Sequence, residues 1–147
     1  MSTPETLFTA PRPPFIMRIM ALIATSIALV ISRFRPIWIK RILLVIRGNA
    51  SEASYEQADM ARDAVIAVST ICAGKGCLPR SIAAAILCRF RGVWPTWQVG
   101  VRTSPFGAHA WIEAEGLKVG ENDTIHAFRP ILTVAPTARK SQKGVSK

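Results

Sequence analysis

Two residues far apart in the sequence, Cys77 and His109, could form a nucleophile and its base. Cys77 follows Gly74-Lys75-Gly76 and precedes an apolar segment, so we expect it at the first turn of a helix. His109 lies in a segment with the alternation of a strand. A helix start lowers the pKa of a thiol, and a histidine within reach can take the proton. The pair therefore predicts nucleophilic chemistry at a cysteine.

The other two cysteines, Cys72 and Cys88, are predicted to pack in the core. Cys72 continues the apolar stripe of the preceding helix, and Cys88 lies deep in the helix that Cys77 begins. Most cysteines act as small buried hydrophobic residues, and only Cys77 has an activating position. With three cysteines and two histidines, we expect no disulfide framework, no metal site and no cofactor. A reducing, cytoplasmic setting fits this composition best.

A carboxylate behind His109 could come from either of two acids. Glu115-Gly116 is predicted to turn a hairpin between a strand over 108–114 and one over 117–119. In that register, paired residue numbers sum to about 231, so His109 faces position 122. Its neighbours Glu121 and Asp123 could each orient the imidazole. The alternative is a structural histidine beside acids that only form a turn.

The periodicity of the chain predicts an α+β fold. Expected helices cover residues 15–32, 36–47, 55–72 and 77–91, and expected extended segments cover 97–102, 108–114, 117–119 and 125–134. The helix that Cys77 begins is apolar on every side, which is typical of a buried helix. We therefore expect the N-terminal helices to come first and this helix to pack on a small antiparallel sheet.

The net charge of +10 lies in the two arms of the 147-residue chain. Residues 51–134 hold eight basic and eight acidic residues, which argues against a nucleic-acid enzyme whose site is a phosphate channel, and no nucleic-acid partner is expected. The basic arms could still meet an acidic partner or an anionic surface. The predicted organisation is a disordered arm over 1–14, an apolar and basic helical segment over 15–50, a core over 51–134 and a disordered basic tail over 135–147.

The helical segment over 15–50 is apolar without being long enough to cross a membrane. Its uninterrupted apolar run, 19–32, has 14 residues, whereas a span needs roughly 20. The Arg-Phe-Arg-Pro sequence that follows is unlike the cleavage region of a signal peptide. We favour a helix that is buried or docks a partner, with membrane association as the alternative.

Several of these segments resemble one known family. They are residues 61–69, 73–82, 99–102, 105–113 and 119–121, and they resemble the transglutaminase-like leader peptidases of lasso-peptide biosynthesis (the B2 proteins). The likeness covers about residues 50–135 and implies a papain- or transglutaminase-like fold with a Cys77–His109–acid triad. The family's third member is usually an Asp twelve residues past the histidine, which here is Glu121. This departure leaves Asp123 as the alternative, and we favour Glu121.

The resemblance also implies a function and partners. The expected activity is that of a cysteine peptidase that removes the leader from a lasso-peptide precursor, with the Cys77 N–H helping to hold the oxyanion. The family includes fusions to a leader-binding domain, and fewer than 50 residues precede the core here. We therefore expect a split form, which works with a small leader-recognition protein in trans and with an ATP-dependent lasso cyclase. The alternatives are another acyltransferase or amidase on this scaffold and a non-enzymatic membrane- or partner-binding protein.

Overall fold

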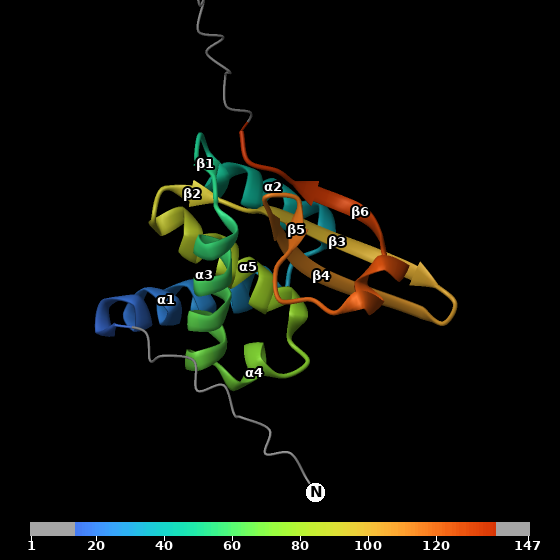
Figure 1. The fold of residues 1–147 in the computed structure, drawn as a ribbon, viewed down its shortest axis with the longest axis horizontal. Helices are drawn as coiled ribbons and strands as arrows, with labels where there is room; N and C mark the ends of the chain where they lie inside the picture. Colours follow the sequence, from blue (N-terminus) through green and yellow to red (C-terminus); the bar gives the residue numbers. More distant parts are fainter. Residues whose placement is uncertain (1–13, 138–147) are drawn as a thin grey trace, which may run out of the picture.

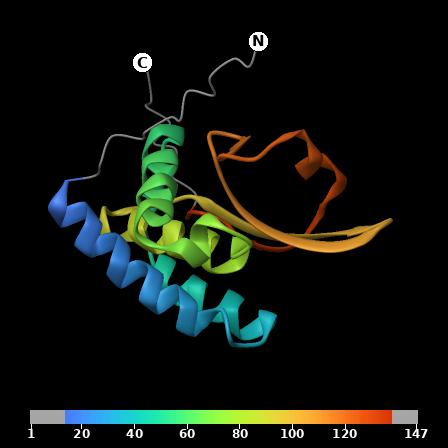
Figure 2. The same cartoon turned by 90° about the horizontal axis from the view of Figure 1, so that it is seen from below.

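The computed structural model describes residues 14–137, apart from the side chain of Asp123. The predicted arms over 1–14 and 135–147 lie almost wholly outside the described residues. The helices gather beside one end of the sheet, and a long hairpin extends away from them (Figures 1 and 2). The predicted class, α+β with N-terminal helices and the cysteine helix on a small antiparallel sheet, is confirmed.

The first two helices are α1 (Phe15–Ile31) and α2 (Pro36–Arg47). Pro36 starts α2 at a position where its missing N–H costs no helical hydrogen bond. On α1 a stripe of small residues, Ala21, Ala24 and Ala28, is fully buried, which lets the helix approach α3 and α5 closely. The opposite face of α1 is exposed, so only one side of this apolar helix contributes to the core.

The expected helix over 55–72 is two helices, α3 (Tyr55–Val68) and α4 (Thr70–Ala73), so the prediction of one helix was wrong. Ser54 and Gln57 form a reciprocal capping box that starts α3. Ser69 is extended, and its hydroxyl accepts a hydrogen bond from the Cys72 N–H at 3.3 Å, so a new helix starts there. This break redirects the chain toward Cys77.

Helix α5 (Cys77–Phe90) begins at Cys77 as predicted and is the centre of the core. Its residues from Ser81 to Cys88 are all buried, packing against α1, α3 and the sheet. The Trp97 Nε1–H donates a hydrogen bond of 3.0 Å to the Ser81 hydroxyl, so a polar contact in the core fixes how α5 lies on the sheet.

The main sheet has the order β5-β4-β3-β6 and is antiparallel throughout. Its strands are β3 (Thr96–Thr103), β4 (Phe106–Ala114), β5 (Leu117–Lys118) and β6 (Arg129–Val134). Glu113 pairs with Lys118 and Ala114 with Leu117, which confirms the predicted hairpin register.

Two details of the strands differ from the sequence prediction. The expected extended segment over 125–134 is extended only in its second part, because Asp123–Ala127 forms the 3-10 helix η1. A short parallel pair, β1 (Ser51–Glu52) with β2 (Val93–Trp94), was not predicted. Strands of two residues carry too little pattern to be recognised in a sequence.

Candidate active site

The loop before α5 holds Cys77 at the first position of the helix. The Gly76 N–H donates to the Ile71 carbonyl at 3.1 Å, and a Cβ at Gly76 would lie 2.5 Å from that oxygen. Arg80, on the first turn of α5, donates to the carbonyls of Cys72 at 3.1 Å and Gly74 at 3.3 Å. A glycine and an arginine therefore fix the position of the cysteine from both sides of the turn.

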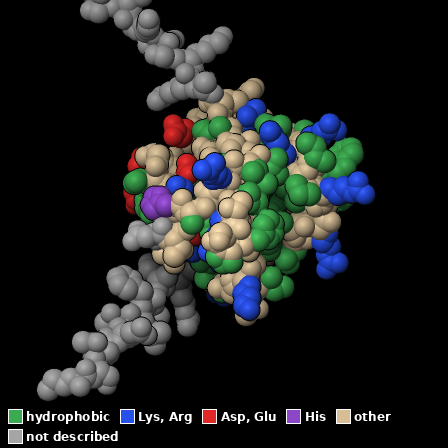
Figure 3. Space-filling view, turned by 90° about the vertical axis from the view of Figure 1, so that its right-hand side faces the viewer, with side chains coloured by type: hydrophobic (Ala, Val, Ile, Leu, Met, Phe, Trp, Pro, Cys, Tyr) green, Lys and Arg blue, Asp and Glu red, His purple; other side chains and the backbone are tan. Residues whose placement is uncertain are grey.

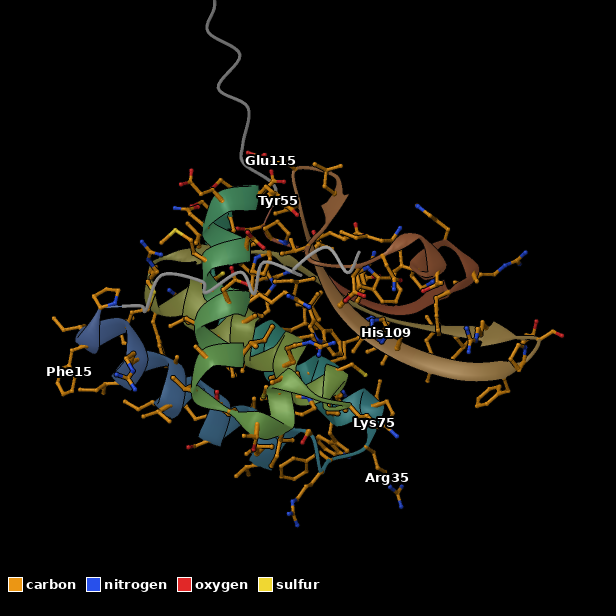
Figure 4. All side chains as sticks on the ribbon, turned by 60° about the horizontal axis from the view of Figure 1, so that its bottom comes forward. Phe15, Arg35, Tyr55, Lys75, His109 and Glu115 are labelled. Atoms are coloured by element: carbon orange, nitrogen blue, oxygen red, sulfur yellow. The ribbon has the colours of Figure 1, made fainter. Side chains whose placement is uncertain are left out.

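His109 lies where the outer edge of β4 has no neighbouring strand. Strand β5 pairs only with Glu113 and Ala114, so the edge beside His109 is open to the start of α5. Figure 4 shows His109 on the sheet and Lys75, two residues before Cys77, on the same side of the molecule, away from Phe15 and Glu115. Because β5 is short, the Cys77 side chain on α5 has space to approach the His109 side chain on β4.

Aromatic rings hold the His109 imidazole from two sides. The Trp111 ring is stacked on the imidazole, with the ring centroids 6.1 Å apart and an interplanar angle of 17°. The Phe128 ring is tilted, with its centroid 5.6 Å from that of the imidazole. Gly100 is the β3 partner of His109, and a Cβ there would lie 2.6 Å from the Trp111 ring. Only a glycine at this position leaves room for the tryptophan that stacks on His109.

Glu121 completes the cluster. Its Oε2 lies 2.9 Å from His109 Nε2, and the exposed fractions of the two side chains are 12% and 21%. Gly120 directs the chain there with a φ of +65°, and a Cβ at this position would lie 2.5 Å from the guanidinium carbon of Arg62 on α3. The structure therefore brings Glu121 to His109. The side chain of Asp123, the alternative acid, lies outside the part of the chain that the structure describes.

The pKa shifts of Cys77 and His109 have opposite signs and a shared cause. A hydrogen bond with His109 is the main cause that lowers the pKa of the Cys77 thiol, against the opposing effect of burial. The Ala110 N–H and the charges of His109 and Arg80 lower it further. Hydrogen bonds to Cys77 and then to Glu121 raise the pKa of His109 to about 9. Both shifts favour a thiolate–imidazolium pair at neutral pH.

The structure shows where the Cys77 amide donates in the absence of a substrate. The Cys77 N–H, which was expected to help hold an oxyanion, donates to the Lys75 carbonyl at 2.9 Å. The tight turn at Gly76 brings that carbonyl under the first amide of the helix. The amide is therefore occupied in this structure, and an oxyanion would depend on other donors.

Sequence reasoning missed two groups that act on the thiol. One is the backbone amide of Ala110, which lowers the pKa of the Cys77 thiol, and the other is Arg80, which holds the loop and also lowers that pKa. The alternation along β4 could have identified Ala110, because every second residue of a strand directs its N–H and C=O to the same side. The Ile112 carbonyl accepts from the Val119 N–H, so Ala110, two residues earlier, also directs its amide to this outer edge. Only the three-dimensional path of the loop identifies the second.

The site has the arrangement of a cysteine-dependent enzyme: the Cys77 thiol at a helix start, the His109 imidazole on a strand and the Glu121 carboxylate beyond the next hairpin strand. Between residues 14 and 137, no three His, Cys, Asp or Glu side chains gather as a metal site would need. The sequence profile of the transglutaminase-like superfamily matches residues 21–133. The chain belongs to this superfamily, whose members are typically cysteine-dependent enzymes. No curated protein and no solved structure matches the chain.

Proposed function

We propose that this protein is a cysteine peptidase that removes the leader peptide from a ribosomally made lasso-peptide precursor. The observation that carries the proposal is the 2.9 Å contact of His109 with Glu121. It places an acid on the histidine at the position where the motif of the leader peptidases has its third member. The segments around Cys77 and His109 that resemble this family support the same assignment.

The proposed reaction starts from the thiolate–imidazolium pair. The Cys77 thiolate attacks the scissile carbonyl carbon, and a tetrahedral intermediate forms. As the C–N bond breaks, the His109 imidazolium gives its proton to the leaving amine of the core peptide. His109 then takes a proton from a water molecule as that water attacks the thioester. Collapse of the intermediate breaks the C–S bond, releases the leader with its new carboxyl group and restores the thiolate–imidazolium pair.

Glu121 has a positioning role in this proposal. Its hydrogen bond to His109 Nε2 leaves Nδ1 as the ring nitrogen for the sulfur. In the neutral ring the Nε2–H donates to the carboxylate, so Nδ1 is the basic nitrogen that can accept the thiol proton. A negative charge at this distance also stabilises the imidazolium that donates the proton.

An exposed apolar and basic surface on α1, α2 and the turn between them supports action together with a separate leader-binding protein. Side chains with 36–82% of their surface exposed include Phe15, Ile16, Leu22, Ile23, Val30, Phe34, Ile37, Trp38, Leu44 and Val45. Residues 15–47 contain six basic residues and no acidic one, and Arg41 lies over the Trp38 ring at 5.2 Å. Figure 3 shows hydrophobic and basic side chains gathered on this side of the molecule.

This surface is large for a chain without a partner, and its occupant is proposed to be the leader-binding protein in the cytoplasm. Within residues 14–137, each helix is too short or too polar to cross a bilayer. An ATP-dependent lasso cyclase is proposed to act next on the released core peptide. Association with an anionic membrane surface is the alternative use of the same face.

The direct test is cleavage of a precursor in vitro. The purified protein would be incubated with the precursor and the leader-binding protein encoded beside its gene, and the products would be weighed by mass spectrometry. The proposal predicts two products whose masses sum to that of the precursor plus one water. An intact precursor after incubation with all three components would count against it.

Acyl transfer to an amine is the second candidate, because the superfamily match fits a cysteine peptidase and an acyltransferase equally. The same thioester would then be resolved by an amine in place of water. A cross-linked product, lighter than its two components by one ammonia or one water, would identify this reaction. Mass spectrometry of the same incubation therefore separates the two candidates.

A further inference from the structure

A second feature of the site is a cavity of about 240 Å³ next to His109. It lies between the β3–β4 hairpin and the segment that runs through η1 to Phe128. Its lining includes Arg102, His109, Glu121, Asn122, Thr124 and Phe128. The cavity therefore shares the imidazole with the proposed reaction, and Arg102 is the group in it that the reaction does not use.

The structure holds the Arg102 side chain in a defined position. Its guanidinium lies over the Phe128 ring at 5.2 Å, and this ring also contacts His109. Gly107 is the β4 partner of Arg102, and a Cβ at Gly107 would lie 3.1 Å from Arg102 Nε. A stacking ring on one side and a glycine on the other therefore fix the guanidinium before any ligand arrives.

The hydrogen-bonding capacity of this guanidinium is not used within the described residues. The Arg102 Nε is buried without a hydrogen-bond partner there, and Arg102 forms no ion pair with a described carboxylate. No described group accepts a hydrogen bond from the other guanidinium nitrogens, so the part of Arg102 that lines the cavity is free to donate to a ligand. A planar guanidinium fits the two oxygens of a carboxylate best.

The remaining charges of the cavity favour the same kind of ligand. Glu121 is already bonded to His109, so its negative charge is matched by the imidazolium. Arg102 is then the unmatched charge among the described side chains that line the cavity, and Asn122 and Thr124 add neutral polar groups. A partly enclosed cation attracts an anion more strongly than an exposed one does.

We propose that this cavity is a specificity pocket in which Arg102 binds the carboxylate of an Asp or Glu side chain of the substrate. The proposal rests on the peptidase function. His109 gives its proton to the leaving amine, so the chain attached to that amine must leave the reaction centre past His109. The pocket on the His109 side is therefore assigned to a residue on the carboxyl side of the cleaved bond.

The test is a comparison of cleavage rates with matched peptides. Internally quenched precursor peptides would carry Asp, Glu, Asn, Gln or Lys in turn at each of the first positions after the cleaved bond. For the wild-type protein, we expect kcat/KM to be about tenfold higher with the acid than with its amide at one of these positions. The Arg102→Gln variant should lose this preference, and Arg102→Glu should favour Lys at the same position.

Arg129→Gln is the matched control, because Arg129 is an exposed arginine on β6, outside the lining of the cavity. It should keep the wild-type preference. The rate of Cys77 alkylation by iodoacetamide would show that the active site is intact in each variant. A wild-type protein without acid preference, or an Arg102→Gln variant that retains it, would overturn the assignment of the pocket.

A second measurement separates failure of the pocket from failure of the peptidase function. Iodoacetate carries the carboxylate that iodoacetamide lacks, and both report on the thiol without any peptide cleavage. The ratio of the iodoacetate rate to the iodoacetamide rate should fall severalfold in Arg102→Gln and stay constant in Arg129→Gln. If no peptide is cleaved, an unchanged ratio in Arg102→Gln rejects the pocket as well, whereas a fall in the ratio keeps a carboxylate site without a peptidase.

Discussion

The two ends of helix α5 each carry a cysteine, and the pKa values of the two thiols are shifted in opposite directions. Cys77 occupies the first position of the helix, where the His109 imidazole and the Ala110 N–H lower the pKa of its thiol. Cys88 lies in the last part of the same helix with 1% of its surface exposed, and burial raises the pKa of its thiol to about 12. The difference arises because one end of the helix meets a polar strand edge and the other end meets the core.

This comparison shows that burial alone does not make a cysteine inert or reactive. Cys77 is itself partly buried, and that burial raises its pKa, but a hydrogen-bonding base outweighs the effect. At Cys88 the positive charge of Arg91 acts in the favourable direction and is too weak to offset desolvation. The presence of the His109 imidazole beside the thiol therefore decides which of the two pKa values is lowered.

The strongest test of the difference is to remove each thiol in turn. Cys77→Ala should lower the cleavage rate by about 10⁴-fold or more, because no other group can form the thioester. Cys88→Ala should leave the rate close to that of the wild type and lower the free energy of unfolding by about 1–2 kcal/mol. Cleavage kinetics and urea titration of both variants would measure this, and substantial cleavage by Cys77→Ala would remove the thiol from the mechanism.

Alkylation would measure the same difference without a substrate. With a pKa of about 12, only about one Cys88 thiol in 10⁵ is ionised at pH 7, and its neighbours shield it from the reagent. Cys77 should therefore react with iodoacetamide at least about 100-fold faster than Cys72 or Cys88. Peptide mapping after timed labelling checks this, and equal, slow labelling of all three cysteines would favour a purely structural role for Cys77.

The third test concerns the group behind the histidine. Glu121→Gln should lower the cleavage rate by roughly 100-fold or more, because the amide can neither balance the imidazolium charge nor fix the tautomer as a carboxylate does. Asp123→Asn is the matched control and should keep most of the rate. If Asp123→Asn lost most of the cleavage rate and Glu121→Gln kept it, Asp123 would be the third member of the triad.

The smallest expected effect is the pH dependence that the two pKa shifts produce. Below the lowered pKa of Cys77 the thiol holds its proton, and above about pH 9 His109 has no proton for the leaving amine. The profile of kcat/KM should therefore be bell-shaped, with an alkaline limb near pH 9. In Cys77→Ala the largest cause that raises the pKa of His109 is gone, so NMR titration should give a value below that of the wild type.

Features that depend on residues close together in the sequence could be predicted, whereas features that depend on tertiary packing could not. The helix start at Cys77 and the hairpin register next to the Glu115-Gly116 turn follow from local pattern and turn chemistry, and both are confirmed. The expected continuation of that pairing, which would set position 122 against His109, is wrong, because β5 ends at Lys118. The break at Ser69 was missed because its polar cap lies inside a continuous helical pattern. The bond between the Cys77 N–H and Lys75 depends on how Gly76 packs against Ile71, which spacing alone cannot predict.

The short β5 has a consequence for how this site could be lost or regulated. The strand ends at Lys118, and Gly120, with its φ of +65°, turns the chain away from β4. Four further residues of pairing, as far as position 122, would bring β5 alongside His109 and occupy the edge of β4 beside the Ala110 amide, which lowers the pKa of the Cys77 thiol. A change of backbone conformation at one glycine could thus close the site by extending the sheet, without altering any of the three side chains proposed to carry the reaction.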